Sequence, residues 1–174
     1  TAGVFPDPSV IILTWLEPQL PPVRRIVAIF GVGLIGQEIA SALKRMYCPE
    51  EIYLPFFWFG RDQHHSQINT IFGTLASVAM KDEVAFTQIS IVWSAGAAGF
   101  AGDEAAFDQE HAAFLSILGL CNNLNENSCF KNIEFHFLSS AGGLYEGQRM
   151  VDYQSLPAPK RPYGRAKLRQ EQTL

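Results

Sequence analysis

The chain has 174 residues, of which 48% are hydrophobic and 17% are charged, as expected for one globular domain with a hydrophobic core. Its net charge of −4 provides no basic surface for a nucleic-acid backbone, so we expect no nucleic-acid partner. No apolar stretch reaches the roughly 20 residues of a membrane span, and three scattered cysteines are typical of reduced thiols in a cytoplasmic protein without a membrane partner.

Residues 1–24 contain five prolines and are expected to form an irregular lead-in, in which residues 10–16 could pack as a short segment. Short apolar runs then predict strands at residues 26–30, 52–59, 89–93 and 133–138. Apolar residues at helical spacing predict helices at residues 34–46, 74–86, 103–124 and from 163 onward. This alternation predicts an α/β fold, a doubly wound parallel sheet with helices on both faces.

The sequence offers no metal site. His64 and His65 are adjacent, so they are not spaced to share a helix face as paired metal ligands would be. We expect both imidazoles to be solvated in a loop.

A glycine motif, G-x-G-x-x-G, occupies residues 31–36 between a predicted strand and a predicted helix. Gly31 would allow the tight turn, Gly33 would let the backbone approach a pyrophosphate, and Gly36 would let helix and strand pack closely. Backbone N–H groups at the start of the helix, around Leu34 and Ile35, would bind the phosphates of NAD or NADP. A tight turn that binds no ligand is the alternative.

Two residues after the second predicted strand bear on the choice of cofactor. Asp62 could accept a hydrogen bond from the ribose 2′-hydroxyl of NAD, whereas Arg61 could pair with the 2′-phosphate of NADP. The two side chains argue in opposite directions, and we lean slightly to NADP. A solvated loop pair without a role is nearly as well supported.

Tyr163 and Lys167 are four residues apart and therefore share one face of the predicted helix. A phenol is a weak base at neutral pH, and a neighbouring ammonium favours its ionised form. The spacing alone is a weak signal. The order of segments says more: the glycine motif comes first, an alanine–glycine loop follows a central strand, and a serine loop precedes Tyr-x-x-x-Lys.

This order resembles the extended short-chain dehydrogenases/reductases, the NAD(P)-dependent epimerase/dehydratase family. The catalytic helix of that family typically opens P-Y-G-x-[AS]-K and carries Glu four residues after Lys, and residues 162–171 match each of these positions. Residues 135–145 resemble the family's "SS…VYG" segment. The resemblance covers residues 25–174 and implies a Rossmann domain that is truncated before a C-terminal substrate domain, so the chain alone could be inactive.

The resemblance also implies roles for individual residues. Tyr163 would be the catalytic acid/base, and Lys167 would bind the nicotinamide ribose and favour the phenolate. Ser140, with Ser139 in reserve, would bind the reacting oxygen, although a serine here could equally cap the strand end.

Ala95 and Gly96 would line the cofactor. The implied reaction is hydride transfer between NAD(P) and a sugar nucleotide by an epimerase, dehydratase or reductase. The implied assembly is a homodimer in which the long helix at residues 103–124 and the Tyr163 helix pair with their mates. The alternative is a regulatory or scaffold protein that binds NAD(P) without chemistry.

Overall fold

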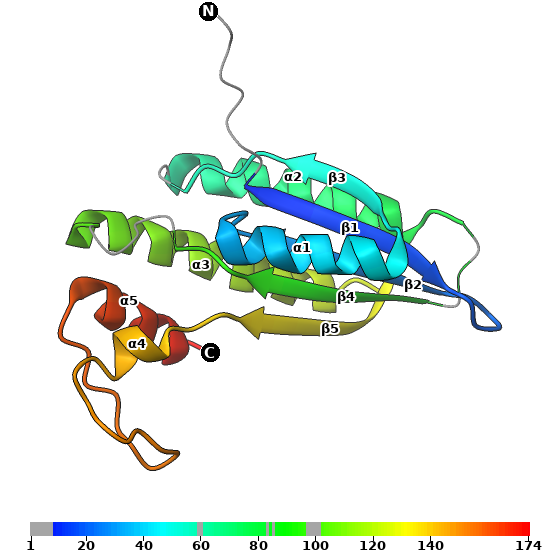
Figure 1. Cartoon of the computed structure of the whole chain (residues 1–174). Coiled ribbons are helices and arrows are strands. Elements are labelled where there is room, and N and C mark those ends of the chain that lie inside the picture. Colours follow the sequence, from blue (N-terminus) through cyan, green and yellow to red (C-terminus); the bar gives the residue numbers. More distant parts are fainter. Residues whose placement is uncertain (1–8, 59–60, 83, 85, 97–101) are drawn as a thin grey trace, which may run out of the picture.

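The computed structural model of the chain describes residues 9–58, 61–82, 84, 86–96 and 102–174. Five strands form one open sheet in the order β3-β1-β2-β4-β5 (Figure 1). Strands β2 (Val23–Phe30), β4 (Phe86–Trp93) and β5 (Phe130–Phe137) pair in parallel. Strand β1 (Val10–Glu17) pairs antiparallel with both β2 and β3 (Glu50–Leu54). The predicted α/β class is confirmed, but the sheet is mixed rather than wholly parallel.

Strand β1 lies in the segment that was expected to be an irregular lead-in. Its sequence, VIILTWLE, is rich in β-branched and aromatic residues, which suit a strand buried on both faces. Val10 and Ile12 enter one hydrophobic core, and Ile11 and Leu13 enter the other. The prolines lie before and after the strand, so they bound it and leave its hydrogen bonds intact. The prediction of an irregular segment is therefore wrong for residues 10–17. Strand β2, which begins at Val23, also starts within the expected lead-in.

Two further boundaries differ from the sequence predictions. Strand β3 ends before Pro55, which has no N–H to continue a ladder, so the strand predicted at 52–59 is too long at its C-terminal end. Helix α2 (Arg61–Ala79) begins well before residue 74, and β4 starts at Phe86, where a helix was predicted. Helix α2 packs on the sheet through Ile68, Ile71 and Leu75.

His64 lies in the first turns of α2 and is buried, so the expected solvated pair is wrong for this residue. Its Nε2 lies 3.1 Å from the carbonyl oxygen of Phe57, and its ring stacks on Phe56. His65 is exposed, as expected.

Helices α1 (Leu34–Tyr47), α3 (Glu104–Asn125) and α5 (Pro162–Glu171) agree with the predicted helices to within a few residues. A short helix α4 (Ala141–Leu144) follows β5 and was not predicted. Helices α2 and α3 cover one face of the sheet and α1 covers the other (Figure 1). Among the described helices, none combines the length and apolar character needed to cross a membrane.

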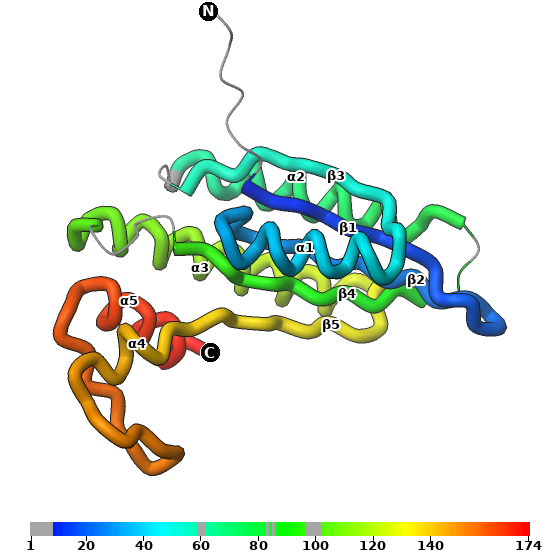
Figure 2. The backbone as a smooth tube through the Cα atoms, in the orientation of Figure 1, coloured from blue at the N-terminus to red at the C-terminus, as the bar shows by residue number. Residues whose placement is uncertain are grey.

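The larger core lies between the sheet and the α2–α3 layer, around Trp93 and Phe114. After β5 the chain turns away from the sheet through α4 and a long connection, then returns in α5 beside α3 (Figure 2). This return brings the predicted catalytic helix to the carboxyl end of the parallel strands.

The interior position of β1, between β3 and β2, leads to a stability prediction. Ile12→Ala should lower the free energy of unfolding by about 2–5 kcal/mol, because the side chain is fully buried between the sheet and the α2–α3 layer. Leu16→Ala, on the exposed end of the same strand, is the matched control and should cost about 1 kcal/mol or less. Denaturant unfolding measures both. Similar losses for the two variants would contradict a β1 that is buried inside the sheet.

Candidate functional site

The candidate site lies where the parallel strands β2, β4 and β5 end. Because parallel strands place their carboxyl ends at one edge of a sheet, the loops that follow them are neighbours. Backbone hydrogen bonds hold these loops together: the N–H of Ser94 donates to Phe30 O (2.9 Å), and the N–H of Leu138 donates to Trp93 O (3.0 Å). The glycine motif, Ala95 with Gly96, and the serine loop therefore come together as predicted from their order in the sequence.

The three glycines of the motif meet different surroundings. Gly31 has φ = +94°, and a Cβ there would lie 2.5 Å from Ala95 Cα. A Cβ on Gly36 would lie 2.2 Å from the carbonyl oxygen of Gly31. A Cβ on Gly33 would meet no described atom within 4 Å. Gly31 and Gly36 are thus required by packing, whereas Gly33 borders open space, which is the arrangement a pyrophosphate cradle needs.

Helix α1 begins directly after this open position. Gly33 is its N-cap, and the first turn contains no acidic residue. The N–H groups of a first helical turn have no partner within the helix, so they can bind an anion. Leu34 and Ile35, which open the helix, have exposed side chains. The residues present therefore fit the diphosphate group of a dinucleotide.

Ser94 holds the glycine turn against the end of β4, a role that the sequence analysis missed. Its hydroxyl donates to the carbonyl oxygen of Gly31 (2.7 Å) and is 3.2 Å from that of Phe30. The available signal was a hydroxyl residue immediately after an apolar strand, at the end where the loops converge. Ala95, the next residue, is buried, and Gly96 is exposed.

Arg61 and Asp62 lie in the first turn of α2, several residues beyond the end of β3. Asp62 is exposed. The side chain of Arg61 lies outside the described part of the structure, and the lean to NADP stays a prediction.

Helix α5 carries the Tyr-x-x-x-Lys pair, with Pro162 in its first turn. The Lys167 side chain is buried and donates to the carbonyl oxygen of Ala95 (2.9 Å). Because Ala95 packs against Gly31, this hydrogen bond joins α5 to the glycine turn. The structure therefore brings Lys167 to the predicted cofactor loops, as the resemblance implied.

Close glycine contacts set the position of Tyr163. A Cβ on Gly164 would lie 2.2 Å from the carbonyl oxygen of Gly143, and a Cβ on Gly143 would lie 3.2 Å from the ring of Tyr163. The hydroxyl of Ser140 accepts from the N–H of Gly143 (3.2 Å) and caps α4. Ser140 and Tyr163 thus both contact Gly143, and Ser140 caps the start of α4 rather than the end of the strand. Ser139 is exposed.

Two influences shift the pKa of Lys167 in opposite directions. Burial lowers the pKa of the ammonium from its ordinary value, and the nearby carboxylate of Glu110 raises it. The ring of Phe137 also lies 5.4 Å from the ammonium nitrogen, a distance at which a cation is attracted to an aromatic face.

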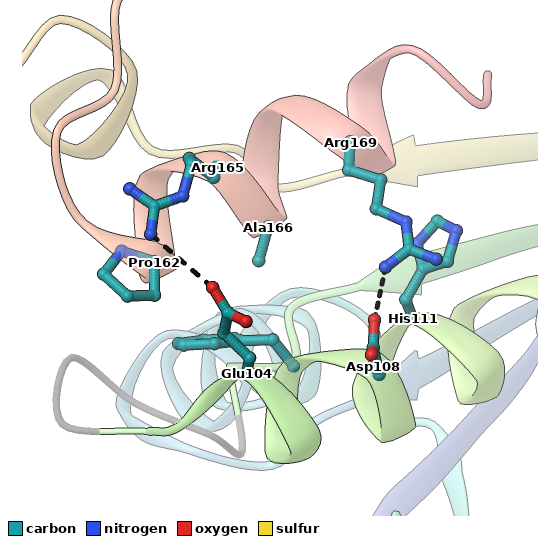
Figure 3. Close-up of a pocket in the computed structure, with 8 residues that line it drawn as sticks. Glu104, Asp108, His111, Pro162, Arg165, Ala166 and Arg169 are labelled. Atoms are coloured by element: carbon teal, nitrogen blue, oxygen red, sulfur yellow. Dashed lines mark hydrogen bonds and ion pairs between the residues drawn. The ribbon is translucent and has the colours of Figure 1, made fainter.

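A separate cavity of about 170 Å³ opens between α3 and α5 (Figure 3), and Lys167 does not line it. Its walls carry the ion pair of Arg169 with Asp108 and the weaker pair of Arg165 with Glu104, whose atoms are 4.0 Å apart. His111 lies behind Arg169, and burial, together with the charge of that arginine, lowers its pKa. This cavity was not predicted from the sequence.

No protein-family model, no curated protein and no solved structure matches the chain. The function is therefore inferred from the geometry of the site.

The glycine contacts predict losses of stability of different size for two substitutions in one motif. Gly36→Ala should destabilise the protein by roughly 1–3 kcal/mol, because the new methyl group collides with the Gly31 carbonyl. Gly33→Ala should cost less than about 1 kcal/mol, since its Cβ meets open space and alanine is only a poorer N-cap. Thermal or denaturant unfolding gives both values. Equal stability of the two variants would show that Gly36 is not a packing glycine.

Proposed function

We propose that the chain is the Rossmann-type, NAD(P)-binding part of an enzyme that acts on a sugar nucleotide, as an epimerase, dehydratase or reductase of the extended short-chain dehydrogenase/reductase kind. The observation that supports this most is the 2.9 Å hydrogen bond from Lys167 to Ala95 O, beside Gly31. It unites the helix that resembles the family's catalytic helix with the glycine motif, although the two are far apart in the sequence.

In this proposal the open position at Gly33 and the first turn of α1 bind the pyrophosphate. Ala95 and Gly96 line the nicotinamide side, where a Cβ on Gly96 would meet no described atom within 4 Å. Lys167 binds the nicotinamide ribose. A bound nicotinamide would supply the hydride acceptor.

The chemistry assigned to the protein itself is proton transfer. Tyr163, as phenolate, takes the proton of a sugar hydroxyl, while Ser140 orients the oxygen that becomes a carbonyl. The packing of Gly143 against the phenol ring fixes the direction in which the ring points. Lys167 follows one helical turn later on the same helix and is the cation assigned to this site.

We further propose a cytoplasmic homodimer. Cys48, Cys121 and Cys129 are free thiols, which suits a reducing compartment. The pairing surface would be the outer face of α3 and α5, where the cavity of Figure 3 and the exposed Leu115 leave apolar surface among the ion pairs.

A second candidate, a regulatory or scaffold protein that binds NAD(P) without chemistry, is favoured by one observation. The Ser140 hydroxyl is already occupied in capping α4, and the Lys167 ammonium is bonded to Ala95 and Gln170. The two side chains that turnover would need, Ser140 and Lys167, thus also have structural roles. Turnover, rather than cofactor binding, separates the two candidates.

A titration of the chain with NAD and NADP tests the cofactor proposal. We expect tighter binding of NADP, a selective loss of NADP affinity in Arg61→Ala, and weaker binding of both cofactors in Gly33→Ala because its methyl group blocks the pyrophosphate. Gln63→Ala, at an exposed residue of α2 with no assigned role, is the control for a general change at the start of α2. Isothermal calorimetry measures each affinity. Equal losses for both cofactors in Arg61→Ala would refute the lean to NADP.

Tyr163→Phe tests the chemistry. The ring that packs on Gly143 is retained, so folding and cofactor binding should survive, whereas turnover of a sugar nucleotide should fall about 100-fold or more without the phenolic proton carrier. Lys167→Ala should impair both binding and turnover. Tyr153→Phe, at an exposed tyrosine before α5, is the matched control and should change neither. Unchanged turnover in Tyr163→Phe would leave only a binding function.

A further inference from the structure

Three polar side chains are buried together between α3 and α5. Glu110 is 2% exposed, Lys167 is 3% exposed and Gln170 is 1% exposed. The Lys167 ammonium donates to Gln170 Oε1 (3.3 Å), and the Gln170 amide donates to Glu110 Oε1 (3.3 Å). Lys167 Nζ and Glu110 Oε1 also form an ion pair at 3.9 Å. The amide of Gln170 therefore bridges the ammonium and the carboxylate.

Stability alone does not account for this cluster. Burying an ammonium and a carboxylate removes both from water, and apolar residues of similar size usually serve a core as well or better. The cluster also adjoins the candidate site, since the same ammonium contacts Ala95 O at the glycine turn. Its position indicates a role in holding Lys167.

We propose that Glu110 is a positioning residue for Lys167: its carboxylate, directly and through Gln170, holds the Lys167 ammonium against the Ala95 carbonyl beside the glycine turn. The consequence for function rests on the proposed role of Lys167 at the cofactor. The coupling of the two charges is a property of the fold and can be tested without a cofactor.

The groups that face the ammonium come from four elements. Glu110 lies on α3, Gln170 lies on α5, the Phe137 ring ends β5, and the Ala95 carbonyl follows β4. Of the described side chains that contact the ammonium, Glu110 brings the formal negative charge.

These contacts determine the direction in which loss of the Glu110 charge shifts the pKa of Lys167. Burial lowers the pKa of Lys167, and the charge of Glu110 opposes that lowering. Glu110→Gln removes the charge but keeps the shape and hydrogen-bonding capacity of the side chain, so Lys167 should release its proton at a lower pH.

The test is a titration of the Lys167 side chain by NMR, through the methylene group next to the amine, which is feasible because the chain has five lysines. In Glu110→Gln we expect the titration to move down by about one pH unit or more. Glu110→Asp keeps the charge at a greater distance, so we expect a smaller downward shift and restored cofactor affinity relative to Glu110→Gln. Asp108→Asn removes a carboxylate from the same helix, on the outer face, and should leave the titration unchanged.

The alkaline limb of NAD(P) binding should shift to lower pH by the same amount as the Lys167 titration, an effect that a merely structural role would not produce. The proposal is overturned if Lys167 titrates alike in the unmodified chain, Glu110→Gln and Glu110→Asp, or if Asp108→Asn shifts it as much as Glu110→Gln. If Glu110→Gln does not fold, the shift of the Lys167 titration in Glu110→Asp alone tests the proposal. If the titration shifts but the unmodified chain binds neither cofactor, the charge coupling stands and the proposed function fails.

Discussion

The meeting of Gly31, Ala95 and Lys167 is the constraint on which the candidate site depends. On one side of Ala95 the backbone of Gly31 approaches so closely that no Cβ could be accommodated at residue 31. On the other side the carbonyl of Ala95 accepts from the buried ammonium of Lys167. A side chain at residue 31 would push the ends of β2 and β4 apart and displace the acceptor of the lysine. The tight turn and the position of α5 are therefore parts of one packing arrangement.

The antiparallel strand β1 lies between β3 and the strand that leads into the glycine turn. Neighbouring strands lie about 4.8 Å apart, so β3, two positions from β2, ends about 10 Å from the glycine turn instead of about 5 Å. In a doubly wound sheet the residue that contacts the adenosine ribose usually comes from the strand next to the glycine motif. Here that neighbour is β1, which runs the other way. In the proposed dinucleotide site, a side chain that selects between NAD and NADP would therefore have to be long or come from beyond β3.

Sequence patterns predicted those features of the fold that depend on residues close together in the chain or on the order of the elements. The alternation of elements and the packing roles of Gly31 and Gly36 could be inferred because each depends on short-range spacing or on the order of parallel strands. The place of β1 could not, since strand pairing is a long-range property and the flanking prolines dominated the sequence pattern. The burial of His64 depends likewise on Phe56 and Phe57, which reach it only in the folded chain. The coupling of Glu110 to Lys167 joins two helices whose contact has no signature in either segment.

Contacts on the inner face of α5 determine the position of Tyr163, the candidate catalytic residue. The exposed ion pairs on the outer face, such as that of Arg169 with Asp108, contribute about 1 kcal/mol or less each, because water and salt screen them. On the inner face, Gly164 lies against the Gly143 carbonyl with no room for a methyl group, and the buried cluster around Lys167 fixes the helix one turn further on. These two contacts leave α5 neither free to rotate nor free to slide. The glycine of the P-Y-G motif is thus needed for packing, and Tyr163, which precedes it, owes its direction to that packing.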